Sequence, residues 1–359
     1  MRKMENIGIL TSGGDAPGMN SAVRAAAFAA RAKGIRLYGI QQGYRGLYEG
    51  AWEELTLERV DQIHSLGGTI LRTARFAPFS DPAKRQAAID RCLANCAGGE
   101  GREGLDGLIV IGGDGSFRGA FDLSKNGLPC VCLPGTIDND IGCTEYTIGY
   151  DTALNCVMEV ADTIADTARS HDRCLILEIM GNKAGDLTLY GGLASGATAV
   201  LLMEYGGFGF PTEGEMTPEA CALFEQSLIA RIRTAQAAGK NYFLVFVAEG
   251  ITGKKDKYGR TRYPGGAERL AKAVQRQTGV ESRADVLAYI QRGGRPTARD
   301  RILSTKMGDY AVHLLARGIS NRVVAIQKEV IVDYEISEAL AMTKALSRED
   351  YDLAWRVSL

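Results

Sequence analysis

Two aspartates separated by one residue, Asp138 and Asp140, end the segment PGTIDND at 134–140, directly after an apolar run. One carboxylate of such a pair can lie beside a divalent cation. The other can take a proton from an attacking alcohol, as phosphoryl transfer requires. A pair of turn aspartates without a chemical role is the alternative interpretation.

Two glycine-rich segments, TSGGDAPGMN at 11–20 and IGGDGS at 111–116, each follow an apolar run and precede a helix-type stretch. Such junctions leave backbone N–H groups free at a helix N-terminus, where phosphate binds. In the second segment Asp114 stands among glycines, and a carboxylate beside phosphate-binding amides is favourable when a cation lies between them. Magnesium bridging phosphate oxygens meets that condition. An ordinary tight turn and a helix N-cap aspartate are the competing interpretations, and no Walker sequence occurs.

Several arginines flank or end the expected strands, and converging guanidinium groups bind a phosphate ester in a bidentate manner. These arginines are Arg75, Arg173, Arg283 and Arg292. Any one of them alone is typical of a solvated surface charge.

Strand-type and helix-type stretches alternate along the chain, which predicts βαβ units and a mostly parallel sheet. We expect strands within 6–14, 35–43, 105–116, 128–140, 173–181, 198–204, 242–250 and 284–294, with a last strand or hairpin at 322–334. We expect helices at 19–34, 82–96, 117–127, 218–239, 266–279 and 300–318, and a surface loop at 252–266. The fold class is therefore α/β, with two doubly wound, Rossmann-like lobes and a seam near Gly149. Ligands of such sheets bind beyond the carboxyl ends of the strands, where the unusual clusters fall.

The bulk composition excludes several classes of protein. A chain of 359 residues with 45% apolar and 24% charged residues is ordinary for a globular protein of two domains. A net charge of −1 gives no basic field for nucleic acid. No apolar run reaches the roughly 18 residues of a membrane span, and no signal peptide is apparent, so we expect a cytosolic protein. The eight cysteines form no CxxC pair, which disfavours zinc and favours reduced thiols.

The segments ILTSGGDAPGMN, GGTILRTARF, IGGDGS, LPGTIDNDI, DLTL and IQRGG, in this order, resemble the bacterial 6-phosphofructokinase family. The resemblance runs from the first strand to about residue 330. GGDG is shared with other kinase families, whereas PGTIDND together with IQRGG is highly specific. The resemblance implies transfer of the γ-phosphoryl group of ATP to the 1-hydroxyl of fructose 6-phosphate, with Mg²⁺, by a homo-oligomer that is typically a tetramer.

The resemblance also implies two lobes with the active site in the cleft between them. Residues 1–149 plus about 291–340 would form the nucleotide-binding lobe, and about 150–290 plus 341–359 the sugar-phosphate-binding lobe. In the family, the equivalents of Arg173 and Arg283 reach in from a neighbouring subunit.

The resemblance assigns roles residue by residue. The nucleotide would be lined by Gly14, Tyr44, Arg75, Phe76, Gly113, Gly115 and Ser116, with Asp114 holding the metal. Asp138 would be the general base, Thr136 would place the reacting phosphoryl group, Asp140 would lie beside the metal, and Arg75 would assist catalysis. The sugar phosphate would contact Thr136, Ile137, Asp138, Arg173, Met180, Gly181, Asn182, Glu249, Arg283, Tyr289 and Arg292.

Two positions bear on the phosphoryl donor. Pyrophosphate-using relatives carry an aspartate where Gly115 stands and a lysine where Gly135 stands. Those side chains would occupy room that the α-phosphate of ATP needs. Glycine at both positions favours ATP.

Two departures from the family pattern concern the sugar side of the site. Asn182 stands where the family has an arginine that stabilises transferring charge, and we hypothesise that Lys183 substitutes for it in part. Asn182 alone is the alternative. Tyr289 replaces a histidine, so a related ketose phosphate such as sedoheptulose 7-phosphate is an alternative acceptor. The sequence also leaves open a pyrophosphate-dependent kinase of the same fold and a non-catalytic regulatory subunit.

A third departure concerns regulation. Family enzymes often bind ADP or phosphoenolpyruvate in a basic pocket between subunits, and Arg24, Arg59 and Lys240 match that pocket. The positions that depart from it are Phe28 and Ala165, which replace arginines, and Thr198, which replaces a glutamate. We therefore expect a weak or altered response to these effectors.

Overall fold

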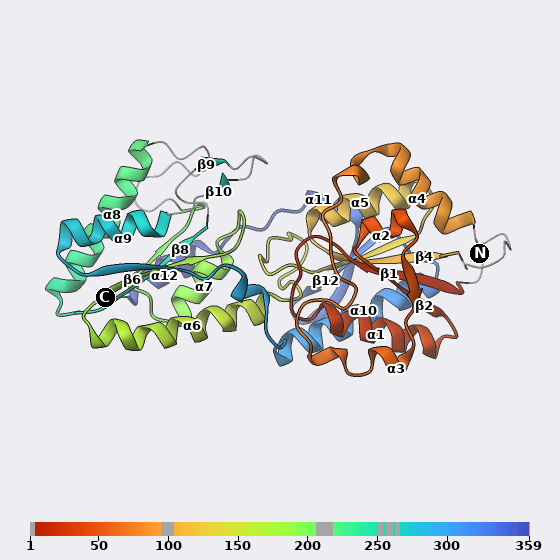
Figure 1. Cartoon of the computed structure of the whole chain (residues 1–359), viewed down its shortest axis with the longest axis horizontal. Coiled ribbons are helices and arrows are strands. Elements are labelled where there is room, and N and C mark those ends of the chain that lie inside the picture. Colours follow the sequence, from red (N-terminus) through yellow and green to blue (C-terminus); the bar gives the residue numbers. More distant parts are fainter. Residues whose placement is uncertain are drawn as a thin grey trace. The chain divides into compact units, whose positions relative to one another are not determined.

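The structure is a computed structural model that describes residues 4–94, 104–205, 218–249, 254–255, 261–262 and 266–358 (Figure 1). The chain divides into two compact units. Unit 1 consists of Met1–Ile137, Ile141–Thr152 and Arg292–Lys344, and unit 2 of Asp138–Asp140, Ala153–Gln291 and Ala345–Leu359. Each unit has its own mostly or wholly parallel sheet, which confirms the predicted α/β class.

Unit 1 is built on a sheet with the strand order β13-β12-β5-β4-β1-β2-β3. Its strands are β1 (Asn6–Thr11), β2 (Arg36–Ile40), β3 (Trp52–Glu54), β4 (Gly107–Gly112), β5 (Cys130–Pro134), β12 (Arg322–Gln327) and β13 (Val330–Glu335). The two edge strands, β3 and β13, pair antiparallel and the strands between them are parallel. The run predicted as a last strand or hairpin at 322–334 is therefore a hairpin.

Helices cover both faces of this sheet, because every residue of β1, β4 and β5 is buried and has to be shielded from water. On one face lie α1 (Met19–Ala32), α3 (Leu57–Val60) and α10 (Ala298–Ala316), and on the other α2 (Tyr44–Glu49), α4 (Pro82–Ala94), α5 (Asp114–Lys125) and α11 (Ile336–Ala341) (Figure 1). Helices α1 and α10 approach closely at Gly308, where a Cβ atom would lie 2.4 Å from the carbonyl oxygen of Ala22.

Unit 2 contains a parallel sheet with the order β11-β6-β8-β7. The strands are β6 (Cys174–Ile179), β7 (Ala199–Leu201), β8 (Phe243–Ala248) and β11 (Ser282–Val286). The helices of the unit are α6 (Tyr150–Ser170), which begins in unit 1, α7 (Asp186–Ala194), α8 (Pro218–Ala237), α9 (Gly266–Thr278) and α12 (Arg348–Arg356). Helices α8 and α9 lie on one side of the sheet and α6 and α7 on the other (Figure 1).

Two expectations about local structure need correction. The strand predicted within 284–294 begins at Ser282 and ends at Val286, and a 3-10 turn, η4 (Ala288–Arg292), follows it. Within the predicted loop at 252–266, β9 (Lys254–Lys255) pairs antiparallel with β10 (Thr261–Arg262), and the loop residues 252–253, 256–260 and 263–265 lie outside the described residues. No helix of the described residues is long and apolar enough to cross a membrane.

The start of α6 is held by one buried carboxylate in the first turn of α10. Asp300, which is 1% exposed, accepts hydrogen bonds from the backbone N–H of Gly149 and of Thr152, both at 2.8 Å. The Thr152 hydroxyl donates to the same carboxylate at 2.5 Å. The pKa of Asp300 is nevertheless raised from 3.8 to about 6, because burial of the charge outweighs these bonds and nearby Asp151 adds repulsion.

This arrangement predicts a pH-dependent contribution to stability. The native state binds a proton more tightly at Asp300 than the unfolded chain does, so acidification from about pH 7 to about pH 4 stabilises the fold through this group. The difference between the pKa values of 3.8 and about 6 corresponds to about 3 kcal/mol. Asp300→Asn removes the titrating carboxyl. The NH₂ group of the asparagine would then face a backbone N–H group, and the two donors cannot form a hydrogen bond with each other. We expect the variant to be less stable, and the gap in urea midpoint from the wild type to widen between about pH 7 and about pH 5.

The matched control is Asp90→Asn, which changes an exposed aspartate on α4 of the same unit. It should leave the pH dependence of the urea midpoint as in the wild type. A gap for Asp300→Asn that stays constant or narrows on acidification would contradict the prediction.

Candidate active site

The first glycine turn follows β1, and the side chains of Thr73 and Arg292 donate hydrogen bonds to its backbone. The Thr73 hydroxyl donates to the carbonyl of Gly13 at 2.8 Å, and Gly13 has a φ of +90°, which glycine adopts at little cost. A Cβ atom at Gly14 would lie 2.6 Å from Nη1 of Arg292, and the same Nη1 donates to the carbonyl of Asp15 at 3.2 Å. The structure therefore brings Gly14 and Arg292 together, although they are far apart in sequence.

The second glycine turn lies between β4 and α5, beside the first. A Cβ atom at Gly112 would lie 2.5 Å from the carbonyl oxygen of Ser12, so the two turns approach closely. They meet where the chain leaves β1 and β4, the point at which the strand order of the sheet reverses. By contrast, a Cβ atom at Gly113 or at Gly115 would meet nothing within 4 Å, so the backbone at the start of α5 is open to a ligand.

Asp114 is the first residue of α5, and its side chain is 52% exposed in a pair with Arg118 at 3.0 Å. A carboxylate between open glycines at a helix N-terminus suits a cation that is shared with phosphate oxygens. Among the described residues, no group of three or more His, Cys, Asp or Glu side chains is placed to hold a metal ion. Magnesium commonly uses one or two carboxylates and completes its shell with phosphates and water, so the donor set at Asp114 fits it.

Tyr44 and Ser116 support the second turn from within the core. Tyr44 is 6% exposed, stacks on Phe79 with ring centroids 4.3 Å apart, and donates its hydroxyl to the carbonyl of Ser116 at 2.5 Å. Burial raises the pKa of Tyr44 well above its usual value, which keeps the hydroxyl a donor. Of the aromatic and basic residues predicted beside the nucleotide, Phe76 is half-buried against Tyr48 and Arg75 is exposed.

The segment at 136–140, which contains Asp138 and Asp140, follows β5, and its residues differ in how far they are buried. Thr136 is half-buried, Ile137 is fully buried, Asp138 is 8% exposed and Asp140 is exposed. Between the two aspartates, Asn139 has a φ of +54°, a left-handed conformation that asparagine tolerates well. The two carboxylates thus sit in different environments, one shielded from water and one in it.

In unit 2, Glu249 at the end of β8 binds the turn that follows β6. Its Oε1 accepts hydrogen bonds from the backbone N–H of Gly181 at 3.1 Å and of Asn182 at 2.7 Å. Met180, the residue before, donates its N–H to Gln291 at 3.1 Å. Gln291 belongs to the IQRGG motif, but no role was predicted for it, since no local pattern reveals a partner 111 residues away.

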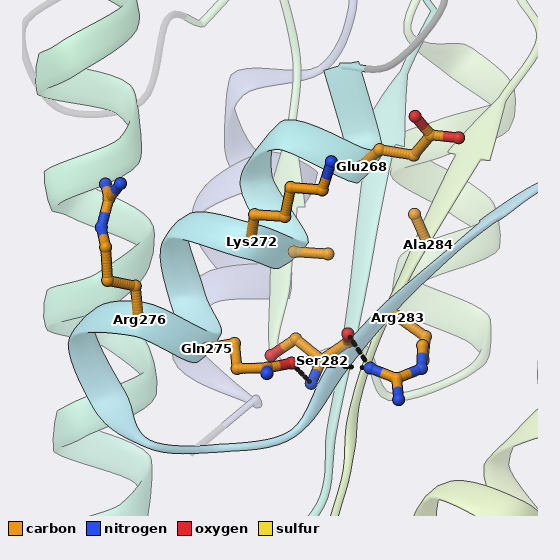
Figure 2. A pocket seen from close by; sticks show the side chains of 8 residues that line it. Glu268, Lys272, Gln275, Arg276, Ser282, Arg283 and Ala284 are labelled. Atoms are coloured by element: carbon orange, nitrogen blue, oxygen red, sulfur yellow. Dashed lines mark hydrogen bonds between the residues drawn. The ribbon is translucent and has the colours of Figure 1, made fainter.

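Arg173 and Arg283 form a separate cluster around Glu281. Arg173 contacts Glu281 at 3.1 Å and Arg283 contacts it at 2.7 Å, and the hydrogen bond from Arg173 lowers the pKa of Glu281. Figure 2 shows Arg283 beside Ser282 and Gln275, at a pocket of about 620 Å³. Arg173 precedes β6 and Met180 follows it, so the length of the strand separates them by roughly 20 Å. The structure does not bring these arginines to the turn at Met180–Asn182 of the same chain.

Tyr289 and the cysteines differ in their exposure to solvent. Tyr289 lies in η4 and is 70% exposed, so its hydroxyl is accessible. The cysteines whose side chains the structure describes are free thiols, and all except half-buried Cys156 are buried.

Comparisons with known proteins agree with this arrangement. A family model described as phosphofructokinase matches residues 6–315. An ATP-dependent 6-phosphofructokinase of Brevibacillus brevis is 43% identical over 99% of this chain and 100% of its own length, and one of Bacillus cytotoxicus is 42% identical with the same coverage. Among solved structures, Pichia pastoris phosphofructokinase is 30% identical, has a TM-score of 0.81 and is matched over 95% of this chain and 38% of its own length. The chain thus spans less than half of that fungal protein.

Proposed function

Because this chain belongs to the phosphofructokinase family, we propose that it transfers the γ-phosphoryl group of ATP to the 1-hydroxyl of fructose 6-phosphate. The observation that carries the proposal is the open backbone at Gly113 and Gly115, beside Asp114 at the start of α5. Free N–H groups at that helix N-terminus suit the phosphates of a nucleotide.

The nucleotide side of the site is assigned to residues of unit 1. The phosphates and base would contact Gly14, Tyr44, Arg75, Phe76, Gly113, Gly115 and Ser116. For Tyr44 the contact is indirect, because its hydroxyl supports the carbonyl of Ser116. Asp114 would hold Mg²⁺, which when bound neutralises charge on the phosphate oxygens.

The proton of the sugar hydroxyl is assigned to Asp138. Its carboxylate is 8% exposed, so it is shielded from bulk water, as a positioned general base commonly is. Thr136 and Ile137, just before it, would contact the reacting group, and Asp140 would lie beside the metal. Arg75 would balance the charge that develops during transfer.

The sugar phosphate is assigned to Met180, Gly181, Asn182, Glu249, Tyr289 and Arg292, together with Arg173 and Arg283 of a neighbouring subunit. The separation along β6 supports this division, because Arg173 precedes β6 and Arg283 on β11 pairs with Leu175 near the start of β6, whereas Met180 follows its end. A homo-oligomer, most simply a tetramer, is therefore part of the proposal.

The donor is assigned to ATP from the environment of two glycines. At Gly115 a side chain would project into open space that a nucleotide can use, and at Gly135 a Cβ atom would already lie 2.8 Å from Ile111 Cγ2 and 3.0 Å from Met19 Cε. A lysine at 135, as pyrophosphate-using relatives have, would need these core side chains to move. The open space at Gly115 supports ATP over pyrophosphate, and the contacts at Gly135 account for glycine at that position.

A coupled turnover assay with the purified protein tests the proposal. ATP is varied against pyrophosphate, and fructose 6-phosphate against sedoheptulose 7-phosphate, with and without Mg²⁺. We expect turnover with ATP and fructose 6-phosphate only when Mg²⁺ is present. Pyrophosphate as the better donor, or sedoheptulose 7-phosphate as the better acceptor, would replace the proposal with a kinase of that specificity.

The response to effectors is expected to be weak, because the basic residues that match the family's effector pocket already have partners. Arg24 donates to Asp61 at 3.0 Å and stacks on Phe28, and Arg59 pairs with Glu53 at 2.6 Å. Lys240 donates to the carbonyl of Ser358 at 3.3 Å, and its pKa is lowered by burial.

We therefore expect the dependence of rate on fructose 6-phosphate to stay near hyperbolic, and ADP or phosphoenolpyruvate to shift its midpoint by less than about threefold, which is under 1 kcal/mol of coupling. Initial rates with each effector at saturating ATP measure this. Strongly sigmoidal kinetics that ADP relieves would contradict the prediction.

A further inference from the structure

A buried glutamine, Gln291, holds the start of the turn that carries Asn182 and Lys183. We propose that Gln291 is a positioning residue for the reaction: its side chain fixes the backbone at Met180 and so places the turn Gly181–Ala184. The inference deepens the proposed function and rests on it, because it gives that turn a part in binding the sugar phosphate and in phosphoryl transfer.

Both ends of the Gln291 amide are engaged. Gln291 is 0% exposed, its Oε1 accepts from the N–H of Met180 at 3.1 Å, and its Nε2 donates to the carbonyl of Ala288 at 3.1 Å. A backbone N–H can be paired only by the oxygen of the amide, so the orientation of the side chain is fixed. The bond to Ala288 ties the amide to its own 3-10 turn, and the bond to Met180 joins that turn to the end of β6.

Gln291 acts together with Glu249. The next two N–H groups of the chain, those of Gly181 and Asn182, both donate to Glu249 Oε1. Three successive backbone donors are thus held by two side chains that come from β8 and from η4. The N–H of Ala184 donates to the carbonyl of Gly181 at 2.8 Å and closes the turn.

The backbone of this turn needs such support. Asn182 has a φ of +56°, and a Cβ atom at Gly181 would lie 2.2 Å from the carbonyl oxygen of Ala184. A left-handed residue costs of order 1 kcal/mol and persists where the surroundings determine it. Without Gln291, the partly buried N–H of Met180 would lose this acceptor, which costs up to about 1–3 kcal/mol, and the turn would relax toward an ordinary conformation.

Relaxation of the turn would displace Asn182 and Lys183 from the positions that the reaction needs. Asn182 and Lys183 are exposed at the tip of the turn, where they can reach a ligand. A displacement of about 1 Å in a group that contacts the reacting atoms can cost about 10²-fold in rate. The nucleotide residues belong to the other unit, so ATP binding should be little affected.

The experiment compares Gln291→Met with the wild-type enzyme. Methionine keeps the length of the side chain and removes both polar atoms. We expect kcat to fall about 10- to 100-fold, the Kd for fructose 6-phosphate measured by calorimetry to rise about tenfold, and KM for ATP to stay unchanged. Equal kcat and equal Kd in the two proteins would overturn the proposal.

Gln291→Glu separates positioning from stability. When protonated, its side chain can accept from Met180 and donate to Ala288 as glutamine does, and when ionised it cannot donate. Burial raises the pKa of such a carboxyl, so kcat relative to the wild type should rise as the pH is lowered from about 8 to about 6. A kcat at about pH 6 as low as that of Gln291→Met would count against the proposal, because the protonated carboxyl restores both hydrogen bonds of the glutamine.

The matched control is Thr278→Val, which removes a side-chain acceptor of a backbone N–H, that of Val280, elsewhere in unit 2. It should lower the melting temperature while kcat stays as in the wild type. If Thr278→Val lowers kcat as much as Gln291→Met does, the effect is one of general stability and the proposal is wrong. If the wild type shows no turnover, the proposed function fails, and the Kd for fructose 6-phosphate alone decides the role of Gln291.

Discussion

Replacing Asp138 with asparagine is expected to lower kcat by about 10²- to 10⁴-fold, the range that a positioned general base contributes. Asparagine has nearly the same shape, so the buried segment after β5 should keep its fold and KM for fructose 6-phosphate should change little. The loss would then fall on proton transfer from the sugar hydroxyl and not on binding.

The measurement uses protein purified from a host without phosphofructokinase activity of its own, because contaminating enzyme sets the detection limit. Asp140→Asn is the comparison, since Asp140 is exposed and is assigned a place beside the metal. Its loss should be smaller than that of Asp138→Asn and should shift the Mg²⁺ dependence. Wild-type kcat in Asp138→Asn would exclude Asp138 as the base and leave the proposed mechanism without a proton acceptor.

The features of the site that depend on chain-neighbouring residues could be predicted from the sequence. Glycines that follow an apolar run identify the turns after β1 and β4, and the turns meet because parallel strands end at the same edge of the sheet. The requirement for glycine is local, as the φ of +90° at Gly13 shows. The α/β class could be predicted from the alternation of strand-type and helix-type stretches, because the hydrophobic pattern of each stretch is also local.

Features that depend on contacts between distant residues were missed or only partly predicted. The hydrogen bond from Tyr44 to the carbonyl of Ser116 and the stacking of Tyr44 on Phe79 were not predicted, and its place beside the nucleotide stays a prediction. Helix α6 was not predicted, because its buried side is formed largely by small residues such as Ala153, Ala161 and Ala165, which carry a weak apolar signal. The joint role of Glu249 and Gln291 depends on tertiary hydrogen bonds that no spacing rule encodes.

The backbone conformation at position 182 gives a physical reason for asparagine where the family resemblance implies an arginine. The turn Gly181–Ala184 places residue 182 at a φ of +56°, where asparagine is among the most favourable residues other than glycine. An arginine would adopt this conformation at a cost of about 1–2 kcal/mol. The family resemblance implied a missing charge at 182, but the sequence could not show that the turn itself favours asparagine.

Lys183 is the residue that we expect to supply the missing charge, and Lys183→Ala should lower kcat by about 10²-fold, as the removal of a comparable stabiliser of transferring charge does. Lys183 is exposed, follows Asn182 in the same turn, and can extend its ammonium group toward a phosphoryl group in transfer. The effect should fall on kcat far more than on KM, because the charge it balances develops in the transition state.

Two further variants separate charge from side-chain bulk. Lys183→Met keeps the length of the side chain without the charge and should behave like Lys183→Ala. Adding Asn182→Arg to Lys183→Ala places a guanidinium where the family has one and should restore part of kcat, less the cost of the left-handed backbone. If Lys183→Ala keeps the wild-type kcat, Asn182 alone suffices, because the neutral amide would then be stabilising the transferring group as a hydrogen-bond donor.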